Sequence, residues 1–335
     1  MADPATAVGR RPLAAKSAKR PESTEKAMRA ALLCSVISEM ILVMSKSPRV
    51  VLASFGPDQF ATLHSACEQA GFVPVSYAYS RSKRPRQRSS PNSGRIVGEV
   101  LDVIPPGMDL LLPGSADGLA TALSGYHPDL IVVYGFSWKL PEAALRLPRY
   151  GVINVHTSLL PRYRGPAPVL WAIRNGDADM GVTIHRMDSE FDTGNIIIQR
   201  GGIPLDDDIT QESLSARINP VISDLLGIAL ERVVTGFPGI PQDDSEASYA
   251  GFMEPGFSHV DWAHTARDIH NQVRTFRFMG SGRGPLGQID GRWVKILQTS
   301  TTRAEGIRID CADGPLWVTE FVPAEPPATD GPAPR

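Results

Sequence analysis

Short apolar runs of strand length alternate with stretches of helical spacing through the first two thirds of the chain. The run 49–54 is followed by a helical pattern that ends at Gly71 and by a second apolar run, 72–79. This order of strand, helix and strand is typical of a parallel α/β sheet. Further strands are predicted by the runs DLLLPG, PDLIVVYG, GVINVH, GVTIHRMD and GNIIIQRGGIPL. A long amphipathic helix is predicted over 210–236, and Pro220 should kink it or divide it in two.

The pattern changes after this helix. Residues 238–251 are rich in Pro, Asp and Ser, which predicts a linker. One helix is predicted over 260–276, and short strands with Asp-Gly turns follow it as far as Pro323. The sequence therefore predicts an α/β domain, a linker, a small β-rich domain and a disordered tail, over 48–237, 238–251, 252–323 and 324–335.

The segment before the first predicted strand, 1–47, raises the question of targeting. Its apolar run, 30–44, follows a basic stretch but is too short to span a bilayer, and Glu39 interrupts it. A small-residue cleavage site is also lacking, so a secretory signal is not favoured. We expect a disordered extension, or a translation start at Met40 or Met44.

Composition excludes several classes of protein. The 335 residues are 42% hydrophobic and carry a formal charge of −2, so nucleic-acid binding would need a local basic patch. The three cysteines are far apart and have no metal-binding spacing, which argues against a disulfide framework or structural zinc and favours the cytoplasm. No GxxxxGK[ST] motif is present, and no GxGxxG motif follows a predicted strand and opens a helix, because the one match, 282–287, precedes a predicted strand. No membrane association is expected.

Polar residues with catalytic potential lie at the carboxyl end of the predicted strand GVINVH. Asn154 and His156 are two positions apart, so in an extended segment their side chains face the same side. The amide can donate a hydrogen bond to a developing oxyanion and the imidazole can exchange protons, as acyl transfer to an amine requires. Of the carboxylates in the loop 187–195, Asp192 is the best partner, because the following Thr-Gly permits a tight turn.

The segment that begins at Asn154 reads NVHTSLLPRYRGPAPVLWAIRNGDADMGVTI and is followed by FDTGNIII. It resembles the signature of the 10-formyltetrahydrofolate-dependent formyltransferases, and the resemblance extends over about 48 to 323. It implies a Rossmann-like N-terminal domain and a barrel-like C-terminal domain. It also implies 10-formyltetrahydrofolate as the formyl donor and a catalytic trio of Asn154, His156 and Asp192.

The mechanism implied by the resemblance is direct formyl transfer from N10 of the folate to an uncharged amine. Asn154 and His156 would stabilise the oxyanion, and His156 or a water held by Asp192 would carry the proton to the leaving nitrogen. The residues implied for folate binding are Tyr134, Gly135, Phe136, Trp138, Leu140, Ser158, Leu159, Asp188, Ser189, Glu190 and Phe191.

Arg162, Arg164 and Gly165 are predicted to bind substrate, the two arginines through the folate glutamate tail or a substrate phosphate. Solvated loop charges are the alternative interpretation of these arginines. A metal site formed by His156, His185 and Asp192 lacks short ligand spacing, so no metal is expected.

The acceptor depends on two charged regions. The basic loop 81–95 matches by position the loop with which tRNA formyltransferases contact tRNA, but it lacks their glycine pattern, and a run of charges is more often a solvated loop. Residues 252–335 hold nine Lys or Arg and ten Asp or Glu, a net charge of −1. We therefore hypothesise a primary amine or hydroxylamine of a small metabolite, such as a modified amino acid or amino sugar. Initiator methionyl-tRNA is the alternative, and a 10-formyltetrahydrofolate hydrolase and a non-enzymatic folate-binding protein are further candidates.

Overall fold

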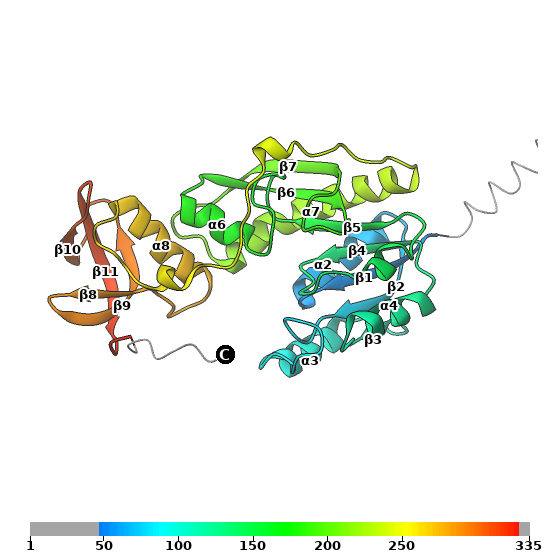
Figure 1. The fold of residues 1–335 in the computed structure, drawn as a ribbon, viewed down its shortest axis with the longest axis horizontal. Helices are drawn as coiled ribbons and strands as arrows, with labels where there is room; N and C mark the ends of the chain where they lie inside the picture. The colour runs from blue at the N-terminus through cyan, green and yellow to red at the C-terminus, as the bar shows by residue number, and fades with distance from the viewer. Residues whose placement is uncertain (1–46, 328–335) are drawn as a thin grey trace, which may run out of the picture. The chain divides into compact units, whose positions relative to one another are not determined.

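The computed structural model describes residues 47–327, and Figure 1 shows how their helices and strands are arranged. The predictions made for residues 1–46 and 328–335 lie outside the described residues. A seven-stranded sheet forms the larger part. In spatial order its strands are β3 (Asp109–Leu111), β2 (Val73–Tyr79), β1 (Arg49–Ser54), β4 (Leu130–Tyr134), β5 (Val152–His156), β6 (Asp179–Arg186) and β7 (Ile196–Pro204).

The first five strands in this order run parallel, whereas β6 and β7 are antiparallel to their neighbours. The predicted class, a mostly parallel α/β sheet, is therefore confirmed. The chain enters the antiparallel part directly after β5, so the polar end of β5 faces β6 across the ladder. Polar side chains of β5 and β6 can therefore lie next to each other at this point of the sheet.

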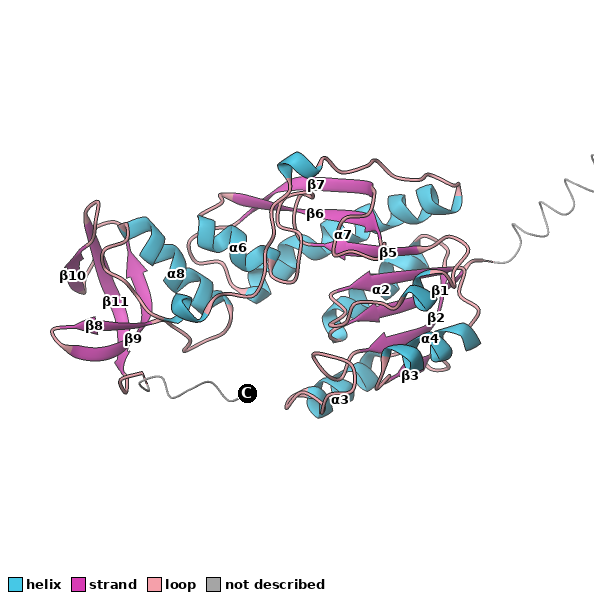
Figure 2. Cartoon of the chain, in the orientation of Figure 1, coloured by secondary structure: helices cyan, strands magenta, loops and turns pink. Residues whose placement is uncertain are grey.

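Helices cover both faces of the sheet (Figure 2). Alternate residues of β1 point to opposite layers, because side chains of a strand alternate between faces. Val50 and Leu52 pack with buried residues of α2 and α7, whereas Val51 and Ala53 pack with those of α4. The helices of this part are α2 (Pro57–Gln69), α3 (Ser93–Val103), α4 (Ala116–Gly125), α5 (Glu142–Leu145), α6 (Pro168–Asn175) and α7 (Gln211–Val234).

Helix α7 runs through Pro220 as one helix, so of the two outcomes predicted there, a kink or a division into two helices, the division is wrong. Its start is fixed by a capping box, in which Thr210 and Ser213 satisfy each other's backbone N–H groups. Ile218, Ile222 and other apolar residues of the helix lie in the core on both sides of the proline. This burial stabilises the helical conformation despite the missing hydrogen bond at Pro220.

The C-terminal part is a curled four-stranded antiparallel sheet covered by one helix, as the barrel-like expectation required. The strands are β8 (Leu286–Ile289), β9 (Arg292–Ser300), β10 (Ile307–Asp310) and β11 (Pro315–Pro323), in the order β10-β11-β9-β8. Short 3-10 helices, η1 (Asp244–Glu246) and η2 (Pro255–Ser258), precede this part. The domain bounds proposed from the sequence remain a prediction.

Helix α8 (Ala266–Phe278) begins later than the sequence pattern predicted. Thr265 is its N-cap, because the hydroxyl accepts a hydrogen bond from the backbone of Asp268. Upstream, Val260 donates its backbone N–H to Leu286 and so belongs to the sheet edge instead of the helix. Within residues 47–327, no helix combines the length and apolar character that crossing a membrane requires.

Candidate active site

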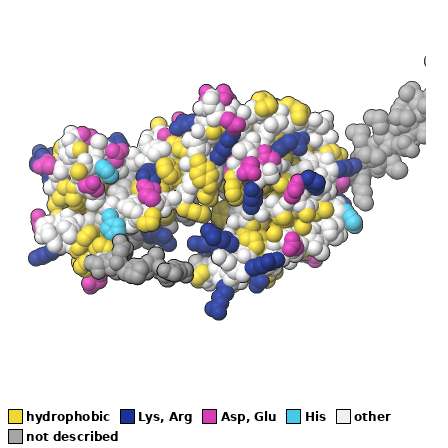
Figure 3. All heavy atoms as spheres, in the orientation of Figure 1, with side chains coloured by type: hydrophobic (Ala, Val, Ile, Leu, Met, Phe, Trp, Pro, Cys, Tyr) yellow, Lys and Arg dark blue, Asp and Glu magenta, His cyan; other side chains and the backbone are white. Residues whose placement is uncertain are grey.

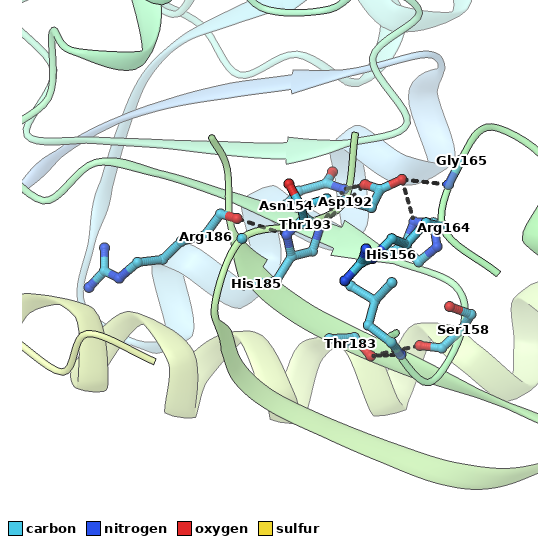
Figure 4. A network of polar contacts seen from close by, with 12 residues as sticks. Asn154, His156, Ser158, Arg164, Gly165, Thr183, His185, Arg186, Asp192 and Thr193 are labelled. Carbon is cyan, nitrogen blue, oxygen red and sulfur yellow. Dashed lines mark hydrogen bonds and ion pairs between the residues drawn. The ribbon is translucent and has the colours of Figure 1, made fainter. Parts of the chain in front are cut away.

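Asn154 and His156 lie at the carboxyl end of β5, with only 9% and 6% of their surface exposed. Asn154 pairs in register with His185 of β6, and His156 pairs with Thr183. The two predicted side chains face the same side, together with His185 (Figure 4). Because β6 runs antiparallel to β5, a second imidazole ring is placed directly opposite the amide.

Asp192 extends from the loop between β6 and β7 into this group of side chains. Its Oδ2 atom lies 3.6 Å from Nδ1 of His156, and its Oδ1 atom lies 3.4 Å from both Nε2 of His185 and Nδ2 of Asn154. The backbone N–H of Gly165 donates to Oδ2 at 2.8 Å. Asp192 is therefore the carboxylate that meets the histidines, as the sequence predicted.

The turn in this loop is not formed by the Thr-Gly step that follows Asp192, as the sequence analysis predicted. Asp192 itself adopts the left-handed conformation, with φ of 57°, which Asp tolerates better than most residues. Gly194 is needed for space, because a Cβ there would lie 1.9 Å from the carbonyl oxygen of Arg186. Asp188 closes the start of the turn by accepting hydrogen bonds from the backbone of Glu190 and the hydroxyl of Thr193.

Hydrogen bonds to carbonyl groups fix the tautomers of the two histidines. His156 donates from Nε2 to the carbonyl of Tyr163 at 2.8 Å, so its Nδ1 atom, which faces Asp192, is free to take a proton. His185 donates from Nδ1 to the carbonyl of Arg186 at 2.8 Å, and its Nε2 atom accepts from Nδ2 of Asn154 at 3.1 Å.

Burial and charge set the protonation of the site. Burial raises the pKa of Asp192, but its contacts with His185 and His156 and the N–H of Gly165 lower it to about 2. Burial lowers the pKa of His156, and the opposing attraction of Asp192 does not reverse this effect. At neutral pH the site thus holds a carboxylate beside an uncharged imidazole. Within residues 47–327, no group of three His, Cys, Asp or Glu side chains has the geometry to hold a metal ion.

His185 is a member of this group that sequence reasoning did not select. The signal was available, because His185 lies two positions after Thr183 in an apolar strand and seven before Asp192. A histidine in such a strand is 1% exposed only if its ring nitrogens find partners.

The loop after β4, Tyr134–Leu140, lies in the core on one side. Trp138 and Leu140 are each 5% exposed, and the indole N–H of Trp138 donates to the carbonyl of Ser82 at 2.7 Å. Phe136 meets Trp138 edge to face, with ring centroids 5.7 Å apart. Gly135 has φ of 72°, and the ring of Phe55 occupies the space where its Cβ would lie. Phe55, exposed at the end of β1, was not selected from the sequence.

A pocket of about 330 Å³ joins two of the segments predicted to bind the folate. It brings Leu140 of the loop after β4 to Ser189 and Glu190 of the loop after β6. Lys139 lies at its edge, 3.9 Å from the carboxylate of Glu190 and 5.3 Å from the centre of the Phe191 ring. Phe191 is 52% exposed, so an apolar face is available beside the pocket. The other residues that line the pocket are Pro141, Glu142 and Leu145.

Ser158 and Leu159, also predicted to bind the folate, contribute to the framework of their own loop. The hydroxyl of Ser158 donates to the carbonyl of Arg162 at 2.7 Å, and its side chain is buried. Leu159 covers Gly181 of β6 and Gly201 of β7, where any Cβ would meet its side chain within 3.0 Å. Both side chains thus fix the path of the chain between β5 and α6.

The three residues predicted to bind substrate also have partners within the chain. Arg162 pairs with Asp177 at 3.2 Å, and the guanidinium of Arg164 donates to Gln242 and pairs with Asp244. The N–H of Gly165 is occupied by Asp192. The structure therefore brings Gly165 to the site and turns both arginines toward other parts of the protein.

The basic loop 81–95 is held in place by hydrogen bonds to backbone carbonyl groups. Ser90 and Ser93 both donate to the carbonyl of Arg81, and Arg86 donates to the carbonyl of Gly114. Its side chains are largely exposed, and Arg95 pairs with Glu99 of its own helix. Lys and Arg side chains gather on this side of the molecule, near α3 (Figure 3). The loop thus presents cationic groups on an ordered support.

A buried amide, two imidazoles and a carboxylate at the edge of an α/β sheet define a group-transfer site that can stabilise an oxyanion and move a proton. Comparison with known proteins specifies the group. Residues 49–227 match the family described as formyl transferase. The chain belongs to this family, and it is a formyltransferase.

Individual relatives agree with this assignment. The chain is 34% identical over 285 residues to a methionyl-tRNA formyltransferase from Citrifermentans bemidjiense, an alignment that covers 79% of this chain and 86% of that protein. Its fold resembles methionyl-tRNA formyltransferase from Clostridium thermocellum, with a TM-score of 0.52, 15% identity, and 83% of this chain and 100% of that one covered.

A further structure of similar fold is WlaRD, a sugar 3N-formyl transferase solved in the presence of dTDP and 5-N-formyl-THF. Its TM-score is 0.54 at 18% identity, with 83% of this chain and 98% of that chain covered. The same fold therefore occurs in proteins named for a tRNA acceptor and for a sugar acceptor.

Proposed function

We propose that the protein transfers a formyl group from 10-formyltetrahydrofolate to a primary amine, using Asn154, His156 and Asp192. The observation that carries this proposal is the convergence of the Asn154 amide and the His156 ring on the carboxylate of Asp192. In a formyltransferase, these groups match the needs of a tetrahedral intermediate, namely an oxyanion donor and a proton carrier.

The reaction begins when the uncharged amine attacks the formyl carbon on N10 of the folate. The carbonyl oxygen of the formyl group becomes an oxyanion, and Nδ2 of Asn154 donates a hydrogen bond to it. The 3.4 Å contact of this amide with Asp192 is longer than its 3.1 Å contact with His185, so the oxyanion replaces the weaker of the two.

The proton released by the amine passes to Nδ1 of His156. This nitrogen is unprotonated at neutral pH, and Asp192 lies beside it at 3.6 Å to stabilise the imidazolium that forms. The same proton then goes to N10 as the bond between N10 and the formyl carbon breaks. The products are the formylated amine and tetrahydrofolate, and the site returns to its starting protonation.

The pocket between the loops after β4 and β6 is where we propose that the pterin binds. Leu140 provides an apolar wall, and Phe191 is exposed beside it. Ser189 and Glu190, which also line the pocket, offer hydrogen-bonding groups. A cleft with apolar walls and a few convergent polar groups is typical of cofactor sites.

For the acceptor, we propose the methionyl group of charged initiator tRNA. This changes the order of the two candidates raised by the sequence, because relatives 34% and 36% identical are named methionyl-tRNA formyltransferases. The ordered basic loop 81–95 would contact phosphates. A small amine is the second candidate, favoured by the net charge of −1 over residues 252–335.

The test is a turnover assay with 10-formyltetrahydrofolate and either charged initiator tRNA or a panel of amino acids, hydroxylated diamino acids and amino sugars. Formylation of the tRNA, with affinity that falls steeply as salt rises, supports the first candidate. Formylation of a small amine alone supports the second. Release of formate without any acceptor identifies a hydrolase, and folate binding without turnover identifies a binding protein; either result overturns the proposal.

A further inference from the structure

The linker between α7 and the small sheet is hydrogen-bonded to the segment that surrounds the active site. Arg164 donates its backbone N–H to Ser248 at 2.9 Å and accepts from Ala250 at 2.6 Å. Tyr163, whose carbonyl holds His156, donates its own N–H to the hydroxyl of Ser248 at 2.9 Å. The linker therefore lies as an added strand beside residues 163–167.

Gln242 connects this linker to the loop that carries Asp192. Its Nε2 group donates to the backbone carbonyls of Asp192 and Gly194, both at 2.8 Å. Its Oε1 atom accepts from Nε and Nη2 of Arg164, at 3.0 and 2.8 Å. Both N–H groups and the oxygen of the amide are thus used, although the residues on either side of Gln242 in the sequence are exposed.

We propose that Gln242 is a positioning residue, which holds the Asp192 carboxylate at the distance from His156 that proton transfer requires. This inference rests on the catalytic role proposed for Asp192. Gln242 contacts none of Asn154, His156 or the Asp192 carboxylate directly. It acts on the backbone of the loop from which that carboxylate extends.

The geometry explains why the loop needs such support. Asp192 is held at φ of 57°, a left-handed conformation that is unfavourable for a non-glycine residue. The carboxylate makes one short hydrogen bond, from Gly165, and its contacts with the histidines are 3.4 Å or longer. Small shifts of this loop would therefore change the alignment with His156, and displacements near 1 Å cost about 100-fold in rate.

The choice of residue is specific, because the position needs two donors and an acceptor from one side chain. Glutamate has the same length and would keep the contact with Arg164. It would also direct carboxylate oxygens at the two carbonyls that now accept hydrogen bonds, and these groups repel. Gln242→Glu therefore separates the positioning of Asp192 from the packing of the linker.

The experiment compares steady-state kinetics of the full chain and of Gln242→Glu, with the acceptor found in the turnover assay. We expect kcat to fall roughly 10- to 100-fold, while tetrahydrofolate binding and the unfolding midpoint stay near those of the wild type. Gln288→Glu is the matched control, since the same change at an exposed position of β8 should leave kcat unchanged. If Gln242→Glu unfolds, Gln242→Met provides the test with a side chain of similar length.

A double-mutant cycle decides between positioning and general destabilisation. If Gln242 acts through Asp192, adding Gln242→Glu to Asp192→Asn should produce little further loss in single-turnover rate. Full additivity of the two losses, or a wild-type kcat for Gln242→Glu, overturns the inference. A wild-type rate for Asp192→Asn alone would instead overturn the proposed catalytic role of Asp192, so the two failures are distinguishable.

Discussion

Asn154 of β5 and His185 of β6 lie directly opposite each other across an antiparallel pair of strands, with Nδ2 3.1 Å from Nε2. Both side chains are buried, and both reach the carboxylate of Asp192. The amide thus has a fixed orientation before any ligand binds, because the imidazole accepts one of its N–H groups. Preorganisation of this kind removes the cost of orienting the donor during the reaction.

Replacing His185 with alanine should therefore reduce kcat, although the ring is not expected to contact the substrate. The change leaves the Asn154 amide without the ring that accepts its N–H and removes the contact between that ring and Asp192 at 3.4 Å. We expect a loss of about 10- to 100-fold in kcat with little change in folate affinity. His64→Ala is the control, because this partly buried histidine of α2 pairs with Glu68 and should leave activity unchanged. Equal kcat values for the two variants would contradict a role for His185.

Asn154→Ala and His156→Ala should each abolish most formyl transfer while the folate still binds. Loss of one oxyanion donor costs roughly 100- to 1000-fold in rate, and loss of the proton carrier removes the route by which the amine is deprotonated. Single-turnover assays measure the chemical step, and calorimetric titration with tetrahydrofolate measures binding. Near-normal turnover of His156→Ala would rule out the mechanism proposed here.

Gly194→Ala should destabilise the loop that carries Asp192. The added Cβ would lie 1.9 Å from the carbonyl oxygen of Arg186, so the backbone must move. We expect the free energy of unfolding to fall by about 1 to 3 kcal/mol, with a loss of activity. Gly98→Ala in α3 is the control, because nothing lies within 4 Å of its Cβ position and alanine favours the helix. Urea unfolding of both variants gives the comparison.

The stability of the protein should depend on pH through His270 of α8. Burial lowers the pKa of this histidine to about 4, and its Nδ1 atom contacts the hydroxyl of Thr299 at 2.9 Å. The unfolded chain binds the proton more readily, so stability is complete above about pH 6.5 and is lost as the pH falls toward 4.

The difference between the pKa of His270 in the folded protein, about 4, and its pKa in the unfolded chain, about 6.5, corresponds to roughly 3 kcal/mol at most. Urea unfolding at pH 7 and pH 4 should therefore show a smaller drop in stability for His270→Asn than for the wild type. An equal drop in both proteins would mean that His270 does not contribute to the pH dependence.

The sequence alone was sufficient to predict the sheet, the small β-rich part and the meeting of Asn154 and His156 with Asp192. Strand periodicity is local, so two residues separated by one share a face wherever the strand lies. The parallel class of the sheet follows in the same way from the alternation of strands and helices along the chain. Even the start of α8, which was misplaced, depended on a local cap at Thr265.

Only the tertiary structure decided which distant residues complete the site. His185 reaches Asn154 because β6 pairs antiparallel to β5, and Gln242 reaches Asp192 from 50 residues away along the chain. Arg164 hydrogen-bonds Gln242 and pairs with Asp244, although the sequence predicted that it binds substrate. A hydrophobic pattern specifies which face of an element is buried, but the partner of a buried polar group depends on register and on loop path. These arise from contacts between segments far apart in the sequence.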